Sequence, residues 1–456
     1  VIQDLRNSVA LVQDKPTYVR AHVRSTAGSI PGVTAELIAR RNGSVIGRQS
    51  PVVESAITVP QNPNRMSVKD SFLFELPTSW RNGNVELEFR GISHTFACKE
   101  PDTDSNSAND GDCKVQAAFI SSPAAKLRLV GIVWKEGETR HEPDEDDMKG
   151  VIRQIEAIFP IPKLDADYPY SIEPVFFASR PDTGGEFSRL NTMIQIQRTW
   201  DCLTHPFSPC DRYYGGVVVD PPTSGGGYVA GVAVDIPSDV FSGYANGTTL
   251  AHEMGHATGR AHTDYNAQRG WEPKEVCGEY VSTRCQQDPP DGTISQSKDH
   301  YSADTRFGYD TRSRTIYNAE TPDLMSYGRN TWPSASTYNN IRQTLVSRYG
   351  STAGAASFWQ EGAAPFAQPV IIVSGEISAT VATGRITSVY QQTAQGAPAL
   401  PVPGNYAIRF EDAAGGSLGV YPFDPLTLTE GDGARIFALA LPWNSNTAHI
   451  APLKDG

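Results

Sequence analysis

Residues 251–262 read A-H-E-M-G-H-A-T-G-R-A-H, and the rest of the chain is best interpreted outward from this stretch. On a helix, positions four apart lie on one face, so His252 and His256 point toward one metal ion. Gly259 has no Cβ, so the chain can leave the helix in a left-handed conformation and return with His262 as a third ligand. Three neutral imidazoles leave the fourth position of a tetrahedral zinc ion open, which is typical of a catalytic site rather than a closed structural one.

Glu253 follows the first histidine directly and can reach a water on the metal, where it would act as general base. The chain has 9 histidines among 456 residues, so chance placement of the whole pattern is rare. A helix with surface histidines and no metal explains none of the spacing. A catalytically inactive site that retained the histidine pattern is a second alternative, and the presence of Glu253 argues against it.

The pattern H-E-x-x-H-x-x-G-x-x-H resembles that of the metzincin zinc endopeptidases, which carry a methionine-containing turn downstream of the third histidine. Residues 322–328, P-D-L-M-S-Y-G, fit this turn. The resemblance implies that Met325 forms an apolar floor beneath the ligands and that Tyr327 lies near the metal and donates to the oxyanion. A packing aromatic is the alternative for Tyr327. The Met-Ser-Tyr order is similar to the serralysin and astacin branches, and the subfamily stays open.

The composition is that of a globular protein, with 39% hydrophobic and 20% charged residues. A net charge of −12 argues against nucleic acid and against an anionic membrane surface as partners, because both attract basic patches. No apolar run approaches the roughly 18 residues that span a bilayer. The chain begins at Val1, and we expect a processed or trimmed form.

The cysteines form local pairs, which are Cys98 and Cys113, Cys202 and Cys210, and Cys277 and Cys285. An even number in such pairs favours three short-loop disulfides and an oxidising compartment, with neighbour pairing as a hypothesis among several connectivities. The absence of a C-x-x-C spacing argues against metal binding by thiolates. We therefore expect a secreted or cell-surface protein, extracellular or periplasmic, and the resemblance favours a bacterial source.

Oxygen-bearing side chains alternate between the first two cysteines, at Asp102, Asp104 and Asn106. This spacing suits Ca²⁺, although the loop lacks the central glycine and the final glutamate of an EF-hand. A solvated acidic loop closed by a disulfide explains the same residues. Both interpretations stay open.

Residues 1–125 have the alternation of half-buried strands. Apolar and polar side chains alternate over residues 19–24, which places His22 on a polar, solvent-facing side. The dipeptide Asn42-Gly43 between two β-like runs is a strong hairpin signal. Several short strands with such turns predict an antiparallel sandwich of immunoglobulin-like type.

From Lys126 onward, strands alternate with helices. Residues 129–134 are almost continuously apolar, as in a strand buried on both faces. Apolar spacing predicts helices over 144–159 and 187–200 and a closing helix over 336–349. This alternation implies a mainly parallel sheet with crossover helices, as in an α/β domain.

Residues 227–235 form a strand candidate before the metal-binding helix. In metzincins the strand in this place is an antiparallel edge that lines the cleft, so the resemblance implies the same role here. An exposed edge offers N–H and C=O groups to which an extended peptide can add as a further strand. The predicted substrate-binding residues are Tyr228, Val229, Ala230, Gly231 and Val232. An ordinary internal strand is the alternative.

After Gly350 the composition resembles a linker, and alternation over 406–411 predicts strands beyond it. The predicted organisation is multidomain. A β-sandwich N-terminal domain covers 1–125, an α/β metzincin-like zinc metalloprotease catalytic domain covers 126–366, and a small β-sandwich C-terminal domain covers 367–456.

These features predict a secreted zinc-dependent endopeptidase with one catalytic Zn²⁺ held by His252, His256 and His262. Its expected partner is a polypeptide or glycoprotein substrate, with neither nucleic acid nor a membrane span. Two alternatives stay open: a glycoprotein-directed protease whose β domains select the substrate, and a non-catalytic binding protein on a metzincin scaffold. A different zinc hydrolase is a further alternative, since zinc held by three imidazoles activates water for other reactions too.

Overall fold

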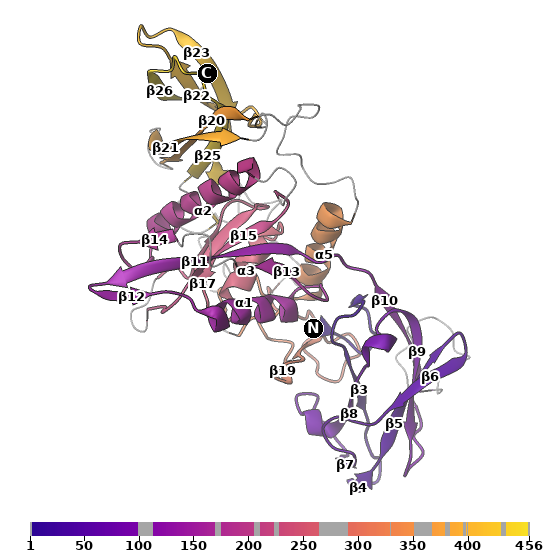
Figure 1. The fold of residues 1–456 in the computed structure, drawn as a ribbon. Helices are drawn as coiled ribbons and strands as arrows, with labels where there is room; N and C mark the ends of the chain where they lie inside the picture. The colour runs from indigo at the N-terminus through magenta and orange to yellow at the C-terminus, as the bar shows by residue number, and fades with distance from the viewer. Residues whose placement is uncertain are drawn as a thin grey trace. The chain divides into compact units, whose positions relative to one another are not determined.

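The computed structural model describes residues 2–98, 113–168, 175–204, 210–222, 228–263, 291–328, 330–350, 367–378, 384–394, 398, 400–429 and 435–454 (Figure 1). Within these residues the chain is mostly β-sheet with few helices, which is compatible with the predicted β-sandwich domains. The chain divides into two compact units. The first unit comprises Val1–Ala124, Gln154–Leu164 and Ala261–Val346, and the second comprises Ala125–Arg153, Asp165–Arg260 and Ser347–Gly456. The division into three domains stays a prediction.

Most strands of the first unit belong to two layers around one core. A five-stranded sheet has the order β2 (Leu11–Val12), β10 (Lys114–Ile120), β9 (Gly83–Gly91), β5 (Ala35–Arg41) and β6 (Ser44–Gln49). Two antiparallel pairs are β3 (Tyr18–His22) with β8 (Ser71–Glu75), and β4 (Ile30–Val33) with β7 (Ile57–Val59). Buried side chains from both sets, among them Leu37, Phe72 and Leu87, form a single apolar cluster. This arrangement fits the expected β-sandwich, because each strand places alternate apolar residues in the shared core.

The predicted hairpin at Asn42-Gly43 is confirmed. Asn42 (φ 51°) and Gly43 (φ 78°) connect β5 to β6, which pair antiparallel. Positive φ at both central residues is what a two-residue turn of type I′ requires. Two short 3₁₀ helices, Val68–Asp70 and Thr78–Trp80, lie elsewhere in this unit.

A three-stranded sheet completes the first unit, with the order β1 (Ile2–Gln3), β18 (Phe307–Asp310) and β19 (Thr315–Tyr317). Residues of β18 approach the polar side of β3, where the rings of Tyr18 and Tyr309 meet edge to face at 5.6 Å. The expectation of a solvent-facing His22 is therefore wrong. His22 is half-buried and lines a cavity together with residues of β18.

The second unit contains a mixed sheet in the order β12 (Thr139–His141), β11 (Lys126–Glu136), β15 (Tyr213–Val218), β17 (Val240–Tyr244) and β16 (Gly231–Ala233), with β13 (Asp165–Asp167) and β14 (Val175–Phe177) also paired to β11. The pairings of β11 with β13, β14 and β15, and of β15 with β17, are parallel. The two edge pairings, with β12 and β16, are antiparallel. The mainly parallel sheet predicted for this region is confirmed.

Four helices are described, and each lies close to its predicted position. They are α1 (Glu145–Ile158), α2 (Gly184–Thr204), α3 (Thr249–Ala257) and α5 (Ala335–Tyr349). Helix α2 packs on the sheet, because Leu190 and Ile194 approach the backbone of Gly216 in β15. Helix α2 is longer than the predicted 187–200 at both ends. Asp182, Thr183 and Glu186 hydrogen-bond to one another at its start, a capping box that extends the helix beyond the apolar stripe.

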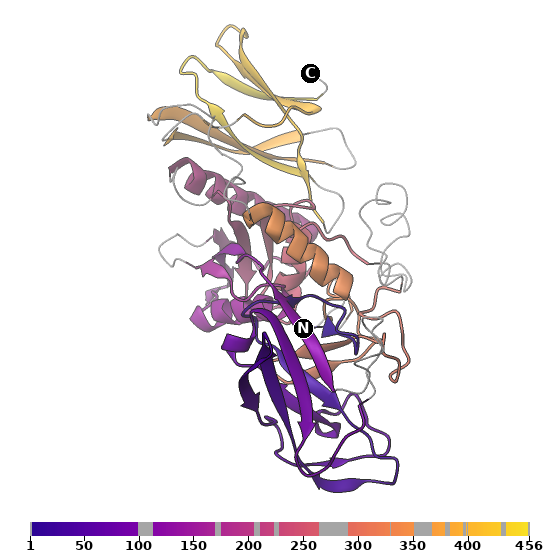
Figure 2. The same cartoon turned by 90° about the vertical axis from the view of Figure 1, so that its right-hand side faces the viewer.

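The C-terminal strands form two sheets, drawn in orange and yellow in Figure 2. One has the order β21 (Gly384–Ala394), β20 (Gln368–Ile377), β25 (Arg435–Pro442) and β24 (Leu426–Thr427); the other has the order β23 (Ser417–Phe423), β22 (Tyr406–Glu411) and β26 (His449–Lys454). Side chains from both sheets, including Ile371, Phe410 and Phe437, share one core. The β24–β25 end also joins the core beneath α2, through Leu428 and Ile436.

Two of the predicted disulfides are present. Cys98 bonds to Cys113 and Cys202 bonds to Cys210, with Cα–Cα distances of 5.1 and 5.3 Å. The third predicted pair, Cys277 with Cys285, lies outside the described residues. The candidate calcium loop at Asp102, Asp104 and Asn106 also lies outside them.

Candidate metal centre

Three buried imidazoles meet at the end of α3. His252 and His256 lie one turn apart on this helix, and His262 follows it. One ring nitrogen from each histidine lies within 4.8 Å of the others, and the three residues are at most 7% exposed. Such a cluster can hold a metal ion, since it offers three nitrogen ligands in a site that water reaches only narrowly.

The local backbone explains why His262 returns to the helix. Helix α3 ends at Ala257, and Gly259 has φ +89°, the left-handed conformation that a residue without Cβ adopts freely. The N–H of Gly259 donates to His256 O (2.8 Å), and the N–H of Arg260 donates to Gly255 O (3.0 Å). These two bonds close the helix and reverse the chain within three residues, as the sequence predicts.

The same turn fixes the tautomer of His256. Nδ1 of His256 lies 2.6 Å from the carbonyl oxygen of Arg260. A carbonyl only accepts, so Nδ1 carries the proton and the lone pair of the neutral ring is on Nε2. A backbone carbonyl that orients a histidine in this way is the usual support of a metal ligand.

The spacing of the ring nitrogens also fits a metal. Nε2 of His256 lies 3.0 Å from Nε2 of His252. Two ligands on a tetrahedral zinc with bonds of about 2.0–2.1 Å are separated by about 3.3 Å, so a small outward movement of the rings accommodates the ion. Imidazole donors suit zinc and also copper, iron and nickel, so the donor set defines a metal centre without selecting the element.

Glu253 lies against the edge strand β16. Its side chain is 3% exposed. A Cβ built on Gly231 would lie 2.8 Å from both Cγ and Oε1 of Glu253, and 2.9 Å from the carbonyl oxygen of Ser242. Glycine is therefore required here by close packing rather than by its φ angle. The sequence pattern assigned Gly231 to the edge strand but gave no signal for this contact.

Met325 and Tyr327 lie close to the third histidine. The N–H of Thr263 donates to Met325 O (2.9 Å), which ties the residue after His262 to the methionine turn. Met325 is fully buried, whereas Tyr327 is 40% exposed. The rings of His262 and Tyr327 meet edge to face with centroids 4.7 Å apart. The methionine turn and the third histidine are thus neighbours, although Met325 follows His262 by 63 residues in sequence.

A buried carboxylate organises the methionine turn. Asp323 is fully buried and accepts hydrogen bonds from the N–H groups of Met325 and Ser334, both at 2.7 Å, and from the hydroxyl of Thr337 at 2.9 Å. Burial raises the pKa of Asp323, although these donors act in the opposite direction. Sequence reasoning missed this role. An aspartate two residues before the methionine, between apolar neighbours, was the available signal.

The predicted substrate strand is shorter than 227–235. Only Gly231–Ala233 forms β16, and Tyr228, Val229 and Ala230 precede it as irregular chain. Tyr244 N donates to Ala230 O (3.0 Å) and Val234 N donates to Val240 O (2.9 Å), so these residues face β17. In an antiparallel pair the alternate residues turn their polar groups away from the neighbouring strand. The outward-facing positions are therefore 229, 231, 233 and 235.

Other segments of the second unit cover much of this edge. Ala233 donates its N–H to Thr429 Oγ1 and accepts from the N–H of Thr429, both at 3.0 Å. The N–H of Asp235 donates to Thr427 O (2.6 Å), and that of Val229 donates to Asp182 O (3.0 Å). Among the described residues, Gly231 is the outward-facing position between 229 and 235 without such a partner. The edge is thus covered on both sides of the glycine that contacts Glu253.

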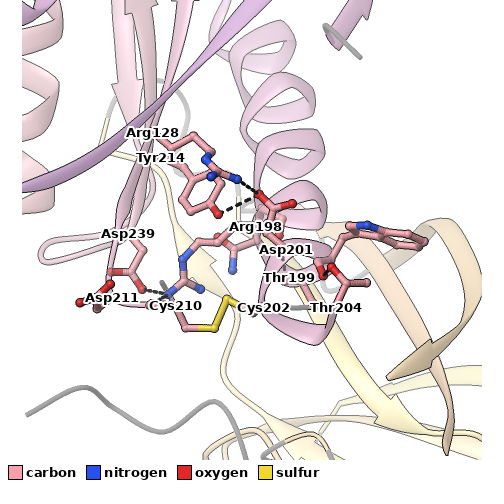
Figure 3. The surroundings of a disulfide bond; sticks show 12 residues. Arg128, Arg198, Thr199, Asp201, Cys202, Thr204, Cys210, Asp211, Tyr214 and Asp239 are labelled. Atoms are coloured by element: carbon pink, nitrogen blue, oxygen red, sulfur yellow. Dashed lines mark hydrogen bonds and ion pairs between the residues drawn. A yellow bond between two sulfur atoms is a disulfide. The ribbon is translucent and has the colours of Figure 1, made fainter. Parts of the chain in front are cut away.

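The Cys202–Cys210 disulfide lies in a network of charged groups (Figure 3). Arg198 donates to Cys210 O (3.0 Å), while Asp201 accepts from Arg128 (2.8 Å) and from the hydroxyl of Tyr214 (2.9 Å). Burial, with Asp201 adding to it, raises the pKa of Tyr214. The bonds of Asp201 link the end of α2 to β11 and β15, and the bond of Arg198 links α2 to Cys210, so the network is a structural one.

No helix within the described residues is long and apolar enough to cross a lipid bilayer. No protein-family model matches the sequence, and no curated protein matches it.

Proposed function

We propose that this chain is a secreted zinc-dependent endopeptidase with a metzincin-like α/β catalytic domain. The observation that carries the proposal is the buried cluster of His252, His256 and His262, which is adjacent to a buried glutamate. Structural zinc sites use four protein ligands, whereas three protein ligands are usual where the metal does chemistry. The two disulfides support secretion, because such bonds persist in oxidising compartments.

A zinc ion held by His252, His256 and His262 would supply Lewis acidity, which would acidify a bound water and polarise a carbonyl. Glu253 accepts the proton of the attacking water and returns it to the leaving amine, as general base and then general acid. Burial suits this role, since a water-poor site strengthens the interaction of the carboxylate with a developing charge. Tyr327, exposed beside His262, donates its hydroxyl to the oxyanion.

The substrate is a polypeptide, and its main chain can form only a few hydrogen bonds with the edge strand β16. Partners at 229, 233 and 235 cover the edge strand, and Gly231 offers one N–H and one C=O to an added strand. Among the described residues this leaves little edge for a long run of backbone hydrogen bonds, which supports selection of the substrate by side-chain contacts. Of the predicted substrate-binding residues 228–232, we therefore propose that Gly231 pairs with the main chain of the substrate.

Cleavage of an unstructured peptide library by wild type and by Glu253→Ala tests the proposal, after each protein is shown to hold one zinc by mass spectrometry. We expect wild type to cut and the zinc-loaded variant to be at least about 100-fold slower, since it lacks the general base. Equal rates would remove Glu253 from the mechanism. If neither protein cuts any peptide, folded protein or glycoprotein while both hold zinc, the result favours the binding-protein alternative over a protease.

Tyr327→Phe separates the two roles of the tyrosine. The variant keeps the ring that contacts His262 and loses only the hydroxyl. We predict that kcat falls about tenfold or more while zinc affinity and KM change little, because the lost donor acts in the transition state. Unchanged kcat would leave Tyr327 as a packing residue.

A further inference from the structure

A cavity of about 340 Å³ lies in the first unit, lined by residues of β3, β18 and the N-terminal segment. None of the metal-centre residues lines it. Its wall is largely apolar, with Leu11, Val12, Val19, Val115 and Phe307. The volume is at the lower end of the roughly 300–1,000 Å³ of small-molecule sites.

The polar part of the wall is basic, in a chain whose net charge is −12. Arg20, Arg65 and Lys15 line the cavity, and Asp4 is the one carboxylate among its lining residues. Asp4 is engaged elsewhere, because it accepts from the N–H and hydroxyl of Ser8. The balance of charge facing the cavity is therefore positive.

Arg20 has only neutral acceptors. Its guanidinium donates to the carbonyl oxygens of Arg65 (3.0 Å) and Ser67 (3.1 Å) and to the hydroxyl of Ser71 (3.2 Å). Within the described residues no carboxylate oxygen lies within 4.0 Å of it. Its charge is oriented by dipoles but not neutralised.

Arg65, like Arg20, donates only to neutral acceptors. Its side chain is buried, with 8% of the residue exposed. It donates to the carbonyl oxygens of His300 and Ser302, both at 3.1 Å, and of Thr305 at 3.3 Å, and it lies 4.2 Å over the ring of Phe307. Its Nε is buried and has no hydrogen-bond partner among the described residues. A buried N–H of a cation without an acceptor is costly, and an anion would compensate it.

The two arginines keep the cavity positive at neutral pH, whereas burial lowers the pKa of Lys15 to about 7. Burial, reinforced by the charge of Arg65, lowers the pKa of Arg20 to about 10, and burial lowers the pKa of Arg65 to about 10, so both stay protonated. Burial and the two arginines lower the pKa of His22 to about 3, which makes it a neutral donor and acceptor. Asp70 acts on Arg20 and Asp4 on Arg65 in the opposite direction, but among the described residues neither arginine has a carboxylate at ion-pair distance. The two neighbouring cations therefore repel each other more strongly than they would in water.

We propose that this cavity binds a small organic anion, a carboxylate on an apolar body. The guanidiniums of Arg20 and Arg65 receive the carboxylate, for which arginine is the best-matched side chain. The apolar wall receives a hydrocarbon or aromatic body. Such a carboxylate has two sources, a free small acid or the carboxyl terminus of a peptide that ends in an apolar residue.

Calorimetry on the full chain tests the proposal with paired probes. Decanoate is compared with decanamide, and a short peptide ending in a leucine carboxylate is compared with its amide. We expect each acid to bind about tenfold or more tightly than its amide, since only the acid carries the charge. The tighter of the two acids identifies the source. Inorganic phosphate competing as well as decanoate would show an anion site without the apolar part.

Two variants localise the binding. Val115→Trp fills the apolar end without altering either arginine, and Arg20→Gln removes one charge. Their controls are Val389→Trp, since Val389 (45%) is about as exposed as Val115 (40%), and Arg385→Gln. Both controls lie on β21, which does not line the cavity. We expect the first pair to weaken decanoate about tenfold or more and the controls to bind as wild type. No binding of either acid to wild type, equal binding of acid and amide, or wild-type affinity in both cavity variants would overturn the proposal. Circular dichroism confirms that each variant folds.

Discussion

The metal centre and the edge strand beside it are built in opposite ways. The three imidazoles come from residues 252–262, and the bonds that turn His262 back toward the helix all lie within this stretch. The edge at β16 is completed from far away in sequence, by Asp182 on one side and Thr427–Thr429 on the other. Local geometry thus fixes the ligands, while tertiary contacts fix what can reach them. Substitutions that act on each kind of contact should therefore have different effects.

The largest effect is expected in the methionine turn next to His262, where contacts between residues distant in sequence support the histidine pattern. Asp323→Ala removes the acceptor of the buried Met325 and Ser334 N–H groups. We predict a loss of about 3 kcal/mol in the free energy of unfolding, because buried donors without an acceptor are costly. Urea unfolding measures it.

Asp412→Ala is the matched control, since Asp412 also accepts from two backbone N–H groups, those of Ala414 and Gly416, but at an exposed site. Water replaces an exposed acceptor, so this variant should lose about 1 kcal/mol or less. Equal losses in the two variants would mean that the methionine turn does not depend on a buried carboxylate.

Gly231→Ala tests a contact between the two regions, that of Gly231 with Glu253. The new Cβ would overlap Glu253 and the backbone of Ser242, so the carboxylate must move. We predict about a 100-fold loss of peptidase activity with zinc content unchanged, since small displacements of a catalytic group have effects of this size. Gly185→Ala, whose Cβ would meet no atom within 4 Å, should keep full activity. Full activity in Gly231→Ala would show that Glu253 tolerates displacement.

The smallest effect concerns the covered edge. Thr429→Val keeps the shape of the side chain and removes the acceptor of the Ala233 N–H. We predict a loss of about 1 kcal/mol and faster hydrogen exchange at the Ala233 amide. Thr427→Val is the control, because Asp235 bonds to the backbone carbonyl of Thr427 and not to its side chain. Unchanged exchange in Thr429→Val would mean that the edge is open in solution.

Periodicity and turn chemistry predicted much of the fold. The helix positions, the hairpin at Asn42-Gly43 and the mainly parallel sheet follow from spacing and from φ preferences, which act over a few residues. The predicted edge strand is longer than the observed one, because residues 228–230 have strand-like composition but only Ala230 bonds to β17, whereas Val229 bonds to Asp182. Composition cannot signal which distant segment will take those bonds.

The features of the candidate site also fall into two groups, those that local sequence predicts and those that depend on distant segments. The histidine spacing and the left-handed Gly259 were readable, since both depend on helix geometry. The sequence does not predict three other features. They are the contact of Gly231 with Glu253, the role of Asp323 and the burial of the polar side of β3. Each depends on a segment far away in sequence that covers a residue whose own pattern indicates exposure or gives no signal.

X-ray absorption at the zinc edge of the zinc-loaded chain, beside His262→Ala, tests the three-imidazole centre most directly. We predict three imidazole nitrogens at about 2.0–2.1 Å in wild type and two in the variant. Two imidazoles in both proteins, or sulfur ligands at about 2.3 Å, would contradict the metal centre that His252, His256 and His262 form here.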